Sequence, residues 1–155
     1  MLDERSWLTT LQTHVQSLPE RPSWNAYFMS AAILLSARST CERLHVGCVL
    51  VSENGNRIIS SGYNGHLSGL PHQSCVINDH EQLTVHAEQN AIAGAAKCGI
   101  STQNAIAYVT HYPCIHCAKI LLAAGIKQCY FHEDYKNDPL VAQLFQNASI
   151  GLEQF

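Results

Sequence analysis

The sequence predicts a single three-layer α/β/α domain, in which helices cover both faces of a mixed sheet of four or five strands. Two observations support this prediction. Two consecutive strand-like runs are joined by an Asn-Gly turn signal, and helical and strand-like segments alternate after them. The chain has 155 residues, which is enough for one core and too few for two. We assign residues 1–155 to one domain, with residues 1–20 as a helical extension.

Each element has a local signal. Apolar residues at helical spacing predict a first helix that ends at Pro19, and Ser23 is a suitable N-cap for a second helix ending near Ser39. Residues 64–85 have no clean period, which indicates a long loop that a function or a ligand orders. The remaining expected elements are strands over 46–51 and 58–63, a helix over 86–98, a strand over 105–110, a helix over 114–124, a strand over 127–132, a helix over 139–147 and a strand over 150–155.

Composition excludes several classes of protein. Nine Lys and Arg against twelve Asp and Glu give a net charge of −3, which argues against a nucleic acid partner. No run approaches the roughly 18 apolar residues of a membrane span, so no membrane partner is expected. Residues 1–21 carry charges of both signs and lack the apolar core of a signal peptide, which favours a cytoplasmic location with reduced thiols. Seven Cys beside nine His then indicate metal binding.

The strongest chemical signal is His86-Ala87-Glu88 together with Pro113-Cys114-Ile115-His116-Cys117. Cys114 and Cys117 fall in the first turn of a predicted helix, where the helix dipole favours thiolates. Parallel packing of this helix against the preceding one would bring His86 onto the same ion. Three His and Cys ligands are typical of catalytic zinc, whose fourth position holds a water with a pKa of about 7. Glu88 is placed to reach that water, whereas a purely structural zinc knuckle would need a fourth protein ligand.

The His-x-Glu and Pro-Cys-x-x-Cys pair is the signature of zinc-dependent nucleobase deaminases. Further matching segments are Ser39-Thr40-Cys41, Val46-Gly47, Gly62-Tyr63-Asn64-Gly65, Gln89-Asn90-Ala91, Tyr108-Val109-Thr110-His111, Ala124-Gly125-Ile126-Lys127 and Asp134-Tyr135-Lys136. In these segments the chain resembles the bacterial and phage deoxycytidylate (dCMP) deaminases of the cytidine deaminase superfamily. The zinc motif alone specifies the superfamily, and the Gly-Tyr-Asn-Gly loop with Tyr135-Lys136 narrows the resemblance to the mononucleotide branch.

This resemblance implies a cytidine-deaminase-like fold and the hydrolysis of dCMP to dUMP and ammonia, which supplies thymidylate synthesis. Glu88 would take a proton from a zinc-activated water and pass it to N3, and it would later protonate the departing amine. Ala87 N–H would hold the pyrimidine, Asn64 the deoxyribose hydroxyl, and His111 would flank the base or support the site. The implied phosphate ligands are Arg38, Tyr135 and Lys136, with Arg43 as a further cationic candidate. Relatives often have Arg in place of Lys136, which lacks the bidentate guanidinium fork.

A second, structural zinc is a further expectation, with candidate ligands Cys41, His72, Cys75 and His80, one of which Glu81 could replace. The alternative is a loop ordered by hydrogen bonds, with Cys41 buried as a small apolar residue. Relatives form homo-oligomers, most often hexamers, and are activated by dCTP and inhibited by dTTP, both with Mg²⁺. The resemblance places the effector loop at Gly62, Tyr63, Asn64 and Gly65. We expect the remaining cysteines to pack in the core, namely Cys48, Cys98 and Cys129.

Three alternatives stay open at this point. A tRNA adenosine deaminase uses the same zinc motif, but it would need a basic surface, which the net charge of −3 disfavours. A cytidine or cytosine deaminase would need no cations for a phosphate. A non-enzymatic structural zinc protein would have no use for Glu88.

Overall fold

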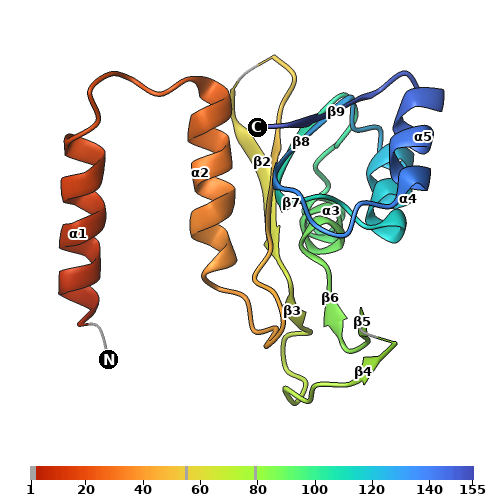
Figure 1. Ribbon diagram of the computed structural model, residues 1–155, viewed down its shortest axis with the longest axis horizontal. Helices are drawn as coiled ribbons and strands as arrows, with labels where there is room; N and C mark the ends of the chain where they lie inside the picture. Colours follow the sequence, from red (N-terminus) through yellow and green to blue (C-terminus); the bar gives the residue numbers. More distant parts are fainter. Residues whose placement is uncertain (1–2, 55, 79) are drawn as a thin grey trace.

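The computed structural model of the protein describes residues 3–54, 56–78 and 80–155 (Figure 1). In chain order its elements are α1 (Glu4–Gln16), α2 (Trp24–Ser36), β1 (Gly47–Val51), β2 (Ile58–Tyr63), β3 (Gly65–His66), β4 (Val76–Ile77), β5 (His80–Glu81), β6 (Thr84–Val85), α3 (Ala87–Lys97), β7 (Ile106–His111), α4 (Ile115–Ala123), β8 (Gln128–Glu133), α5 (Pro139–Asn147) and β9 (Gly151–Gln154).

The main sheet has five strands in the order β2-β1-β7-β8-β9. The pairs β2–β1 and β1–β7 are antiparallel, whereas β7–β8 and β8–β9 are parallel. Two small antiparallel pairs, β3–β6 and β4–β5, lie apart from it in the segment between β2 and α3. The predicted mixed sheet is therefore confirmed, with the upper of the two expected strand numbers.

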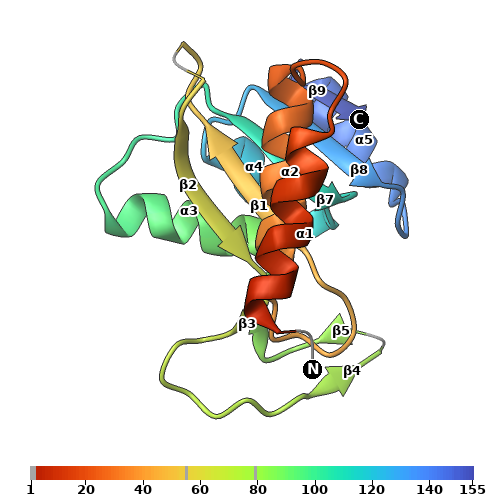
Figure 2. The same cartoon turned by 90° about the vertical axis from the view of Figure 1, so that its left-hand side faces the viewer.

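Helices cover both faces of this sheet (Figures 1 and 2). Strand β1 is buried along its whole length, and its alternate residues belong to different cores. Val49 and Val51 pack with Phe28 of α2 on one face, whereas Cys48 and Leu50 pack toward α3, α4 and α5 on the other. Burial on both faces explains why the sequence of this strand is a continuous apolar run. Because helices pack on both faces of the sheet, the predicted three layers are confirmed.

Local signals located most of the element ends. The Ser23 hydroxyl caps α2 by accepting a hydrogen bond from Ala26 N–H at 3.1 Å. Two expectations were wrong in part. Residues 64–85 contain the short strands β3 to β6, and Cys98 is exposed at the end of α3, so it is not a core residue. Gly55 of the expected Asn-Gly turn lies outside the described residues.

Helix α1 lies beside the domain and contributes none of its residues to the core (Figure 1). It retains one apolar stripe, on which Trp7 and Val15 are 44% and 57% exposed. This arrangement is consistent with the expected helical extension, and the assignment of all 155 residues to one domain stays a prediction. Among the helices in the described residues, none combines the length and the apolar character needed to cross a membrane.

Gly62 of β2 allows α3 to lie close to the sheet. A Cβ at this position would lie 2.4 Å from Ala87 O and 2.5 Å from Ala91 N, so the helix would have to move. We expect Gly62→Ala to lower the free energy of unfolding by about 1–3 kcal/mol, as overpacking does, in a urea titration. Gly94→Ala is the matched control, because its Cβ would meet only Ser60 Oγ, at 3.2 Å. Equal stability of the Gly62 variant and the parent would contradict this reading of the contact.

Candidate active site

Three metal-ligating side chains meet where α3 and α4 begin. His86 is the N-cap of α3 and Cys114 is the N-cap of α4, so the two helix starts face one another. His86 Nδ1 lies 3.5 Å from Cys114 Sγ and 3.3 Å from Cys117 Sγ. The ligand atoms of these three residues all lie within 4.8 Å of one another. The parallel packing expected from the sequence thus brings the three side chains together.

This spacing fits one tetrahedral zinc ion. Ligand bonds of about 2.0 Å to nitrogen and 2.3 Å to sulfur place the two ligand atoms roughly 3.5 Å apart, close to the distances found. The chemistry of the donors also fits. A hydrogen bond from the Cys117 thiol, with further help from His86, lowers the pKa of Cys114 to about 3, so this thiol ionises readily. The same hydrogen bond, together with burial, raises the pKa of Cys117, so this second thiol would lose its proton when the metal binds. His86, Cys114 and Cys117 could therefore hold zinc and leave a fourth position open.

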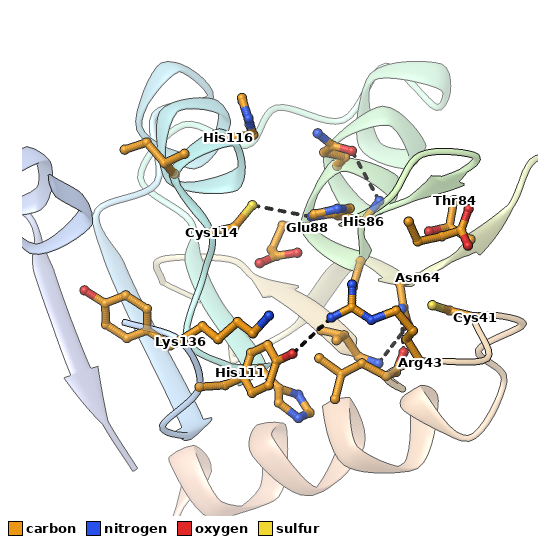
Figure 3. Close-up of a pocket in the computed structure, with 18 of the residues that line it drawn as sticks. Cys41, Arg43, Asn64, Thr84, His86, Glu88, His111, Cys114, His116 and Lys136 are labelled. Atoms are coloured by element: carbon orange, nitrogen blue, oxygen red, sulfur yellow. Dashed lines mark hydrogen bonds between the residues drawn. The ribbon is translucent and has the colours of Figure 1, made fainter. Parts of the chain in front are cut away.

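Glu88 lies in the first turn of α3, next to this cluster. Its side chain is only 4% exposed, and burial raises the pKa of its carboxyl above the ordinary value. Nearby Cys114 acts in the same direction. Figure 3 shows the carboxyl group beside Cys114 and His86, at the cavity. A buried carboxyl that is not needed as a ligand is suited to accept a proton and return it.

A cavity of about 760 Å³ opens in front of these residues (Figure 3). Its size is within the range of ligand pockets, roughly 300–1,000 Å³. Of the residues expected to bind substrate, the cavity is lined by Asn64, Ala87, His111, Tyr135 and Lys136. Since α3 begins at Ala87, the N–H of this residue has no partner within the helix and is available at the cavity wall.

The cations of the cavity differ from the expected set in one position. Arg43 lines the cavity together with Lys136, whereas Arg38 is exposed and does not belong to the lining. The Arg43 guanidinium donates a hydrogen bond to the Tyr135 hydroxyl at 3.4 Å, and Lys136 Nζ lies 5.8 Å from the Tyr135 ring centroid. Lys136 has a left-handed φ of 45°, which is uncommon for a residue with a side chain and is found often at binding sites.

His111 is held by its neighbour Thr110. The Thr110 hydroxyl accepts a hydrogen bond from Gly47 N–H at 3.1 Å and lies 2.9 Å from His111 Nδ1. Because Thr110 is only 4% exposed, its hydroxyl is fully satisfied when it donates its proton to Nδ1. Burial lowers the pKa of His111, so a neutral ring with its proton on Nε2 is favoured. This ring makes an edge contact with Tyr135, with 5.9 Å between the ring centroids.

The expected second metal site is not assembled in the part of the chain that the structure describes. There, the only group of three ligating side chains is the His86, Cys114 and Cys117 cluster. Cys41 is buried, Cys75 is half-buried, and the His72 ring stacks on His66 with 4.9 Å between centroids. The side chain of His80 lies outside the described residues. The second zinc therefore stays a prediction.

Hydrogen bonds to Glu81 order the loop in which those residues lie. Its carboxylate accepts from the Ser74 hydroxyl, from Cys75 N–H at 2.9 Å and from Leu83 N–H at 3.0 Å. These bonds, that from Ser74 above all, lower the pKa of Glu81 to about 2. This arrangement agrees with the alternative of a loop ordered by hydrogen bonds.

Known proteins share this arrangement of sequence and fold. Residues 22–133 match the family described as the cytidine and deoxycytidylate deaminase zinc-binding region. The chain belongs to this deaminase family. Among the relatives of this deaminase, ComE operon protein 2 of Bacillus subtilis (strain 168) is 48% identical over 139 residues, covering 87% of this chain and 72% of that protein.

Two further relatives of this deaminase carry more specific names. The deoxycytidylate deaminase of Schizosaccharomyces pombe is 38% identical over 147 residues, and the match spans 87% of this chain but only 45% of that protein. A crystal structure of dCMP deaminase from the cyanophage S-TIM5, in complex with dCMP and dUMP, superimposes with a TM-score of 0.76. It is 30% identical and the match covers 88% of this chain and 99% of that one. The expected cytidine-deaminase-like fold is thus confirmed.

Proposed function

We propose that the protein converts dCMP to dUMP and ammonia, and so supplies dUMP for thymidylate synthesis. One observation supports this substrate above the others: the cavity is lined both by Glu88 with His86 and Cys114 of the metal cluster and by the cations Arg43 and Lys136. The first set suits the amine of a pyrimidine, and the second suits a 5′-phosphate. The names of the Schizosaccharomyces pombe and cyanophage relatives point to the same reaction.

The chain's own residues have distinct tasks in this reaction. Zinc, when bound by His86, Cys114 and Cys117, supplies the acidity that makes water a nucleophile at neutral pH. Glu88 takes up one proton of that water and hands it to N3 of the pyrimidine. It then takes the second proton from the oxygen now bonded to C4 and delivers it to the amine, which leaves as ammonia. Its burial excludes bulk water from the path of this proton. The free N–H of Ala87 at the start of α3 holds the pyrimidine edge.

The remaining contacts orient the nucleotide. Asn64 lies at the cavity and offers one amide N–H to the deoxyribose hydroxyl, since its other polar groups are already bonded to protein. His111 flanks the base with its Nε2 proton. Arg43, Tyr135 and Lys136 receive the phosphate. Ammonia release from dCMP, CMP, deoxycytidine and dCTP tests the proposal as a whole, and a clear preference for deoxycytidine over dCMP would contradict it.

Arg43→Ala is expected to lower kcat/KM for dCMP by about 10- to 100-fold, because hydrogen bonds to a charged group contribute about 1.5–3 kcal/mol. Turnover of deoxycytidine, which has no phosphate, should change less than about twofold. Steady-state kinetics on both substrates measure the two effects. Arg38→Ala tests whether Arg43 or Arg38 binds the phosphate. If Arg38→Ala lowers kcat/KM for dCMP as much as Arg43→Ala does, Arg38 is the phosphate ligand instead.

Regulation and assembly are further parts of the proposal. We infer activation by dCTP and inhibition by dTTP, each with Mg²⁺, through the loop of Gly62, Tyr63, Asn64 and Gly65. This loop contacts α3 directly, because Asn90 Nδ2 donates to Tyr63 O at 3.0 Å, so a ligand at the loop has a short path to His86 and Glu88. Initial rates with each triphosphate test it, and rates unchanged by both would remove the regulatory proposal.

We also propose a homo-oligomer, a hexamer by resemblance, in a cytoplasmic location. Exposed aromatic side chains on α1 and α2 support the assembly, since Trp7 and Trp24 are 44% and 46% exposed. The location is supported by the seven cysteines, all of which are free. Light scattering measures the mass of the assembly, and a monomer at micromolar concentration would contradict it.

A further inference from the structure

The connection between α2 and β1 carries Arg43 to the cavity and is fastened on both sides of that residue to the side chain of Asn64. We propose that Ser39 is a positioning residue, which acts through this fastening to hold Arg43 where it meets the substrate phosphate. The inference rests on the proposed function, because it concerns how the phosphate of dCMP is bound.

The first fastening precedes Arg43. The Ser39 hydroxyl lies 2.8 Å from Asn64 O and 2.7 Å from Asn64 Oδ1, and can donate its one proton to either oxygen. The same hydroxyl accepts a hydrogen bond from Cys41 N–H at 3.2 Å. One side chain thus ties the start of the connection to the loop after β2 and also fixes the turn toward Arg43.

The next residue strengthens this fastening. Thr40 Oγ1 accepts a hydrogen bond from His66 N–H at 3.0 Å. A Cβ on Gly65 would lie 2.5 Å from Thr40 Oγ1, so the two segments approach as closely as they do because residue 65 is glycine. Ser39 and Thr40 therefore bind to Asn64 and His66 of the Gly-Tyr-Asn-Gly-His segment.

The second fastening follows Arg43. Val46 N–H donates to Asn64 Oδ1 at 2.7 Å, and Asn64 Nδ2 donates to Leu44 O at 2.6 Å. Asn64 is only 7% exposed, so these bonds form away from bulk water. Residues 41–43 consequently form a short span whose two ends are set by one buried amide.

This geometry matters for binding because Arg43 is itself exposed. A long cationic side chain on a free loop would lose both loop and rotamer freedom when it meets a phosphate, which weakens binding. A loop fixed in advance leaves only the side chain to be ordered. Removing the Ser39 hydroxyl should free the start of the span, while Val46 and Leu44 still hold Asn64 at the cavity.

A double-mutant cycle tests the proposal in the full-length protein, with dCMP as substrate. We expect Ser39→Ala to raise KM for dCMP about tenfold and to change kcat less than about twofold, since the reacting groups are untouched. In an Arg43→Ala background, Ser39→Ala should lower kcat/KM by less than about twofold, because the residue through which it acts is gone. Ser39→Thr keeps the hydroxyl and should restore most of the KM.

Ser60→Ala is the matched control. It removes a similar half-buried hydroxyl, which donates to Ala91 O at 2.6 Å, and it should leave KM for dCMP near the wild-type value. Independent, additive effects of Ser39→Ala and Arg43→Ala would overturn the positioning role, as would a loss confined to kcat. Wild-type protein that releases no ammonia from dCMP would instead overturn the proposed function itself, so the two failures are distinguishable.

Discussion

Glu88→Gln is expected to lower kcat for dCMP by about 10³-fold or more, since general acid–base catalysis contributes about 10²–10⁴-fold and this residue serves two proton transfers. The substitution preserves the size of the side chain, which matters at a site that is 4% exposed. Gln cannot accept and return a proton. Ammonia release at saturating dCMP measures the effect.

The zinc content of the Glu88→Gln variant should equal that of the parent, because Glu88 is not a ligand in the proposed site. Metal analysis of the same sample checks this point. Glu133→Gln is a matched control: it is the same substitution at an exposed residue outside the cavity lining, and its kcat should stay within about twofold of the parent. Normal turnover by Glu88→Gln would show that another group moves the proton.

Cys117→Ala is expected to lose the catalytic zinc and, with it, all measurable deamination of dCMP. Cys117 is fully buried beside His86 and Cys114, so its sulfur is one of three protein ligands that the cluster offers and bulk water does not reach its place. Second-sphere substitutions alone typically reduce metal affinity 10- to 100-fold, and loss of a direct ligand should exceed that. Zinc per chain, measured after gel filtration, should fall by about one equivalent.

The control for this variant is Cys129→Ala, which removes a fully buried thiol from the core rather than from the cluster. It should retain zinc and activity and lose only stability, by roughly 1–2 kcal/mol for the small cavity. Retention of a full equivalent of zinc by Cys117→Ala would overturn the ligand assignment. The number of equivalents in the parent, one or two, also tests the predicted second zinc.

Most of the fold could be predicted because the signals are local. Ser23 caps a helix through its own hydroxyl, and Gly99 and Gly125 follow helix ends with left-handed φ angles of 67° and 78°. The short strands between β2 and α3 could not be predicted, because a two-residue strand shows no periodicity. Their pairing depends on contacts such as that of Gly65 with Val85, which are distant in sequence.

The same distinction applies to the site. His86, Cys114 and Cys117 lie in two compact motifs at helix starts, so their meeting follows from the packing of two helices. Arg43 and Arg38 are indistinguishable as isolated basic residues of one irregular segment. Only the path of that segment separates them, and the bonds of Asn64 to residues 20 and 18 positions earlier set this path. The sequence does contain a signal for this path, in the two motifs Ser39-Thr40-Cys41 and Gly62-Tyr63-Asn64-Gly65. It predicts the path only if the two motifs are interpreted together, as segments that contact one another.

Because β1 is antiparallel to both of its neighbours, the cavity-lining segments gather at one end of the sheet. Substitutions at the two ends of the molecule therefore have different consequences for the cavity. Because β1 runs antiparallel to β2 and β7, its first residue lies beside Tyr63 of β2, and Cys48 lies beside Val109 near the end of β7. Both neighbours lead directly into cavity-lining segments. The opposite end carries the exposed Glu53–Lys127 ion pair of 2.8 Å and, among the residues that the structure describes there, none that line the cavity. Substitutions at the first end therefore fall beside the ligand, whereas substitutions around the ion pair at the other end leave the cavity lining unchanged.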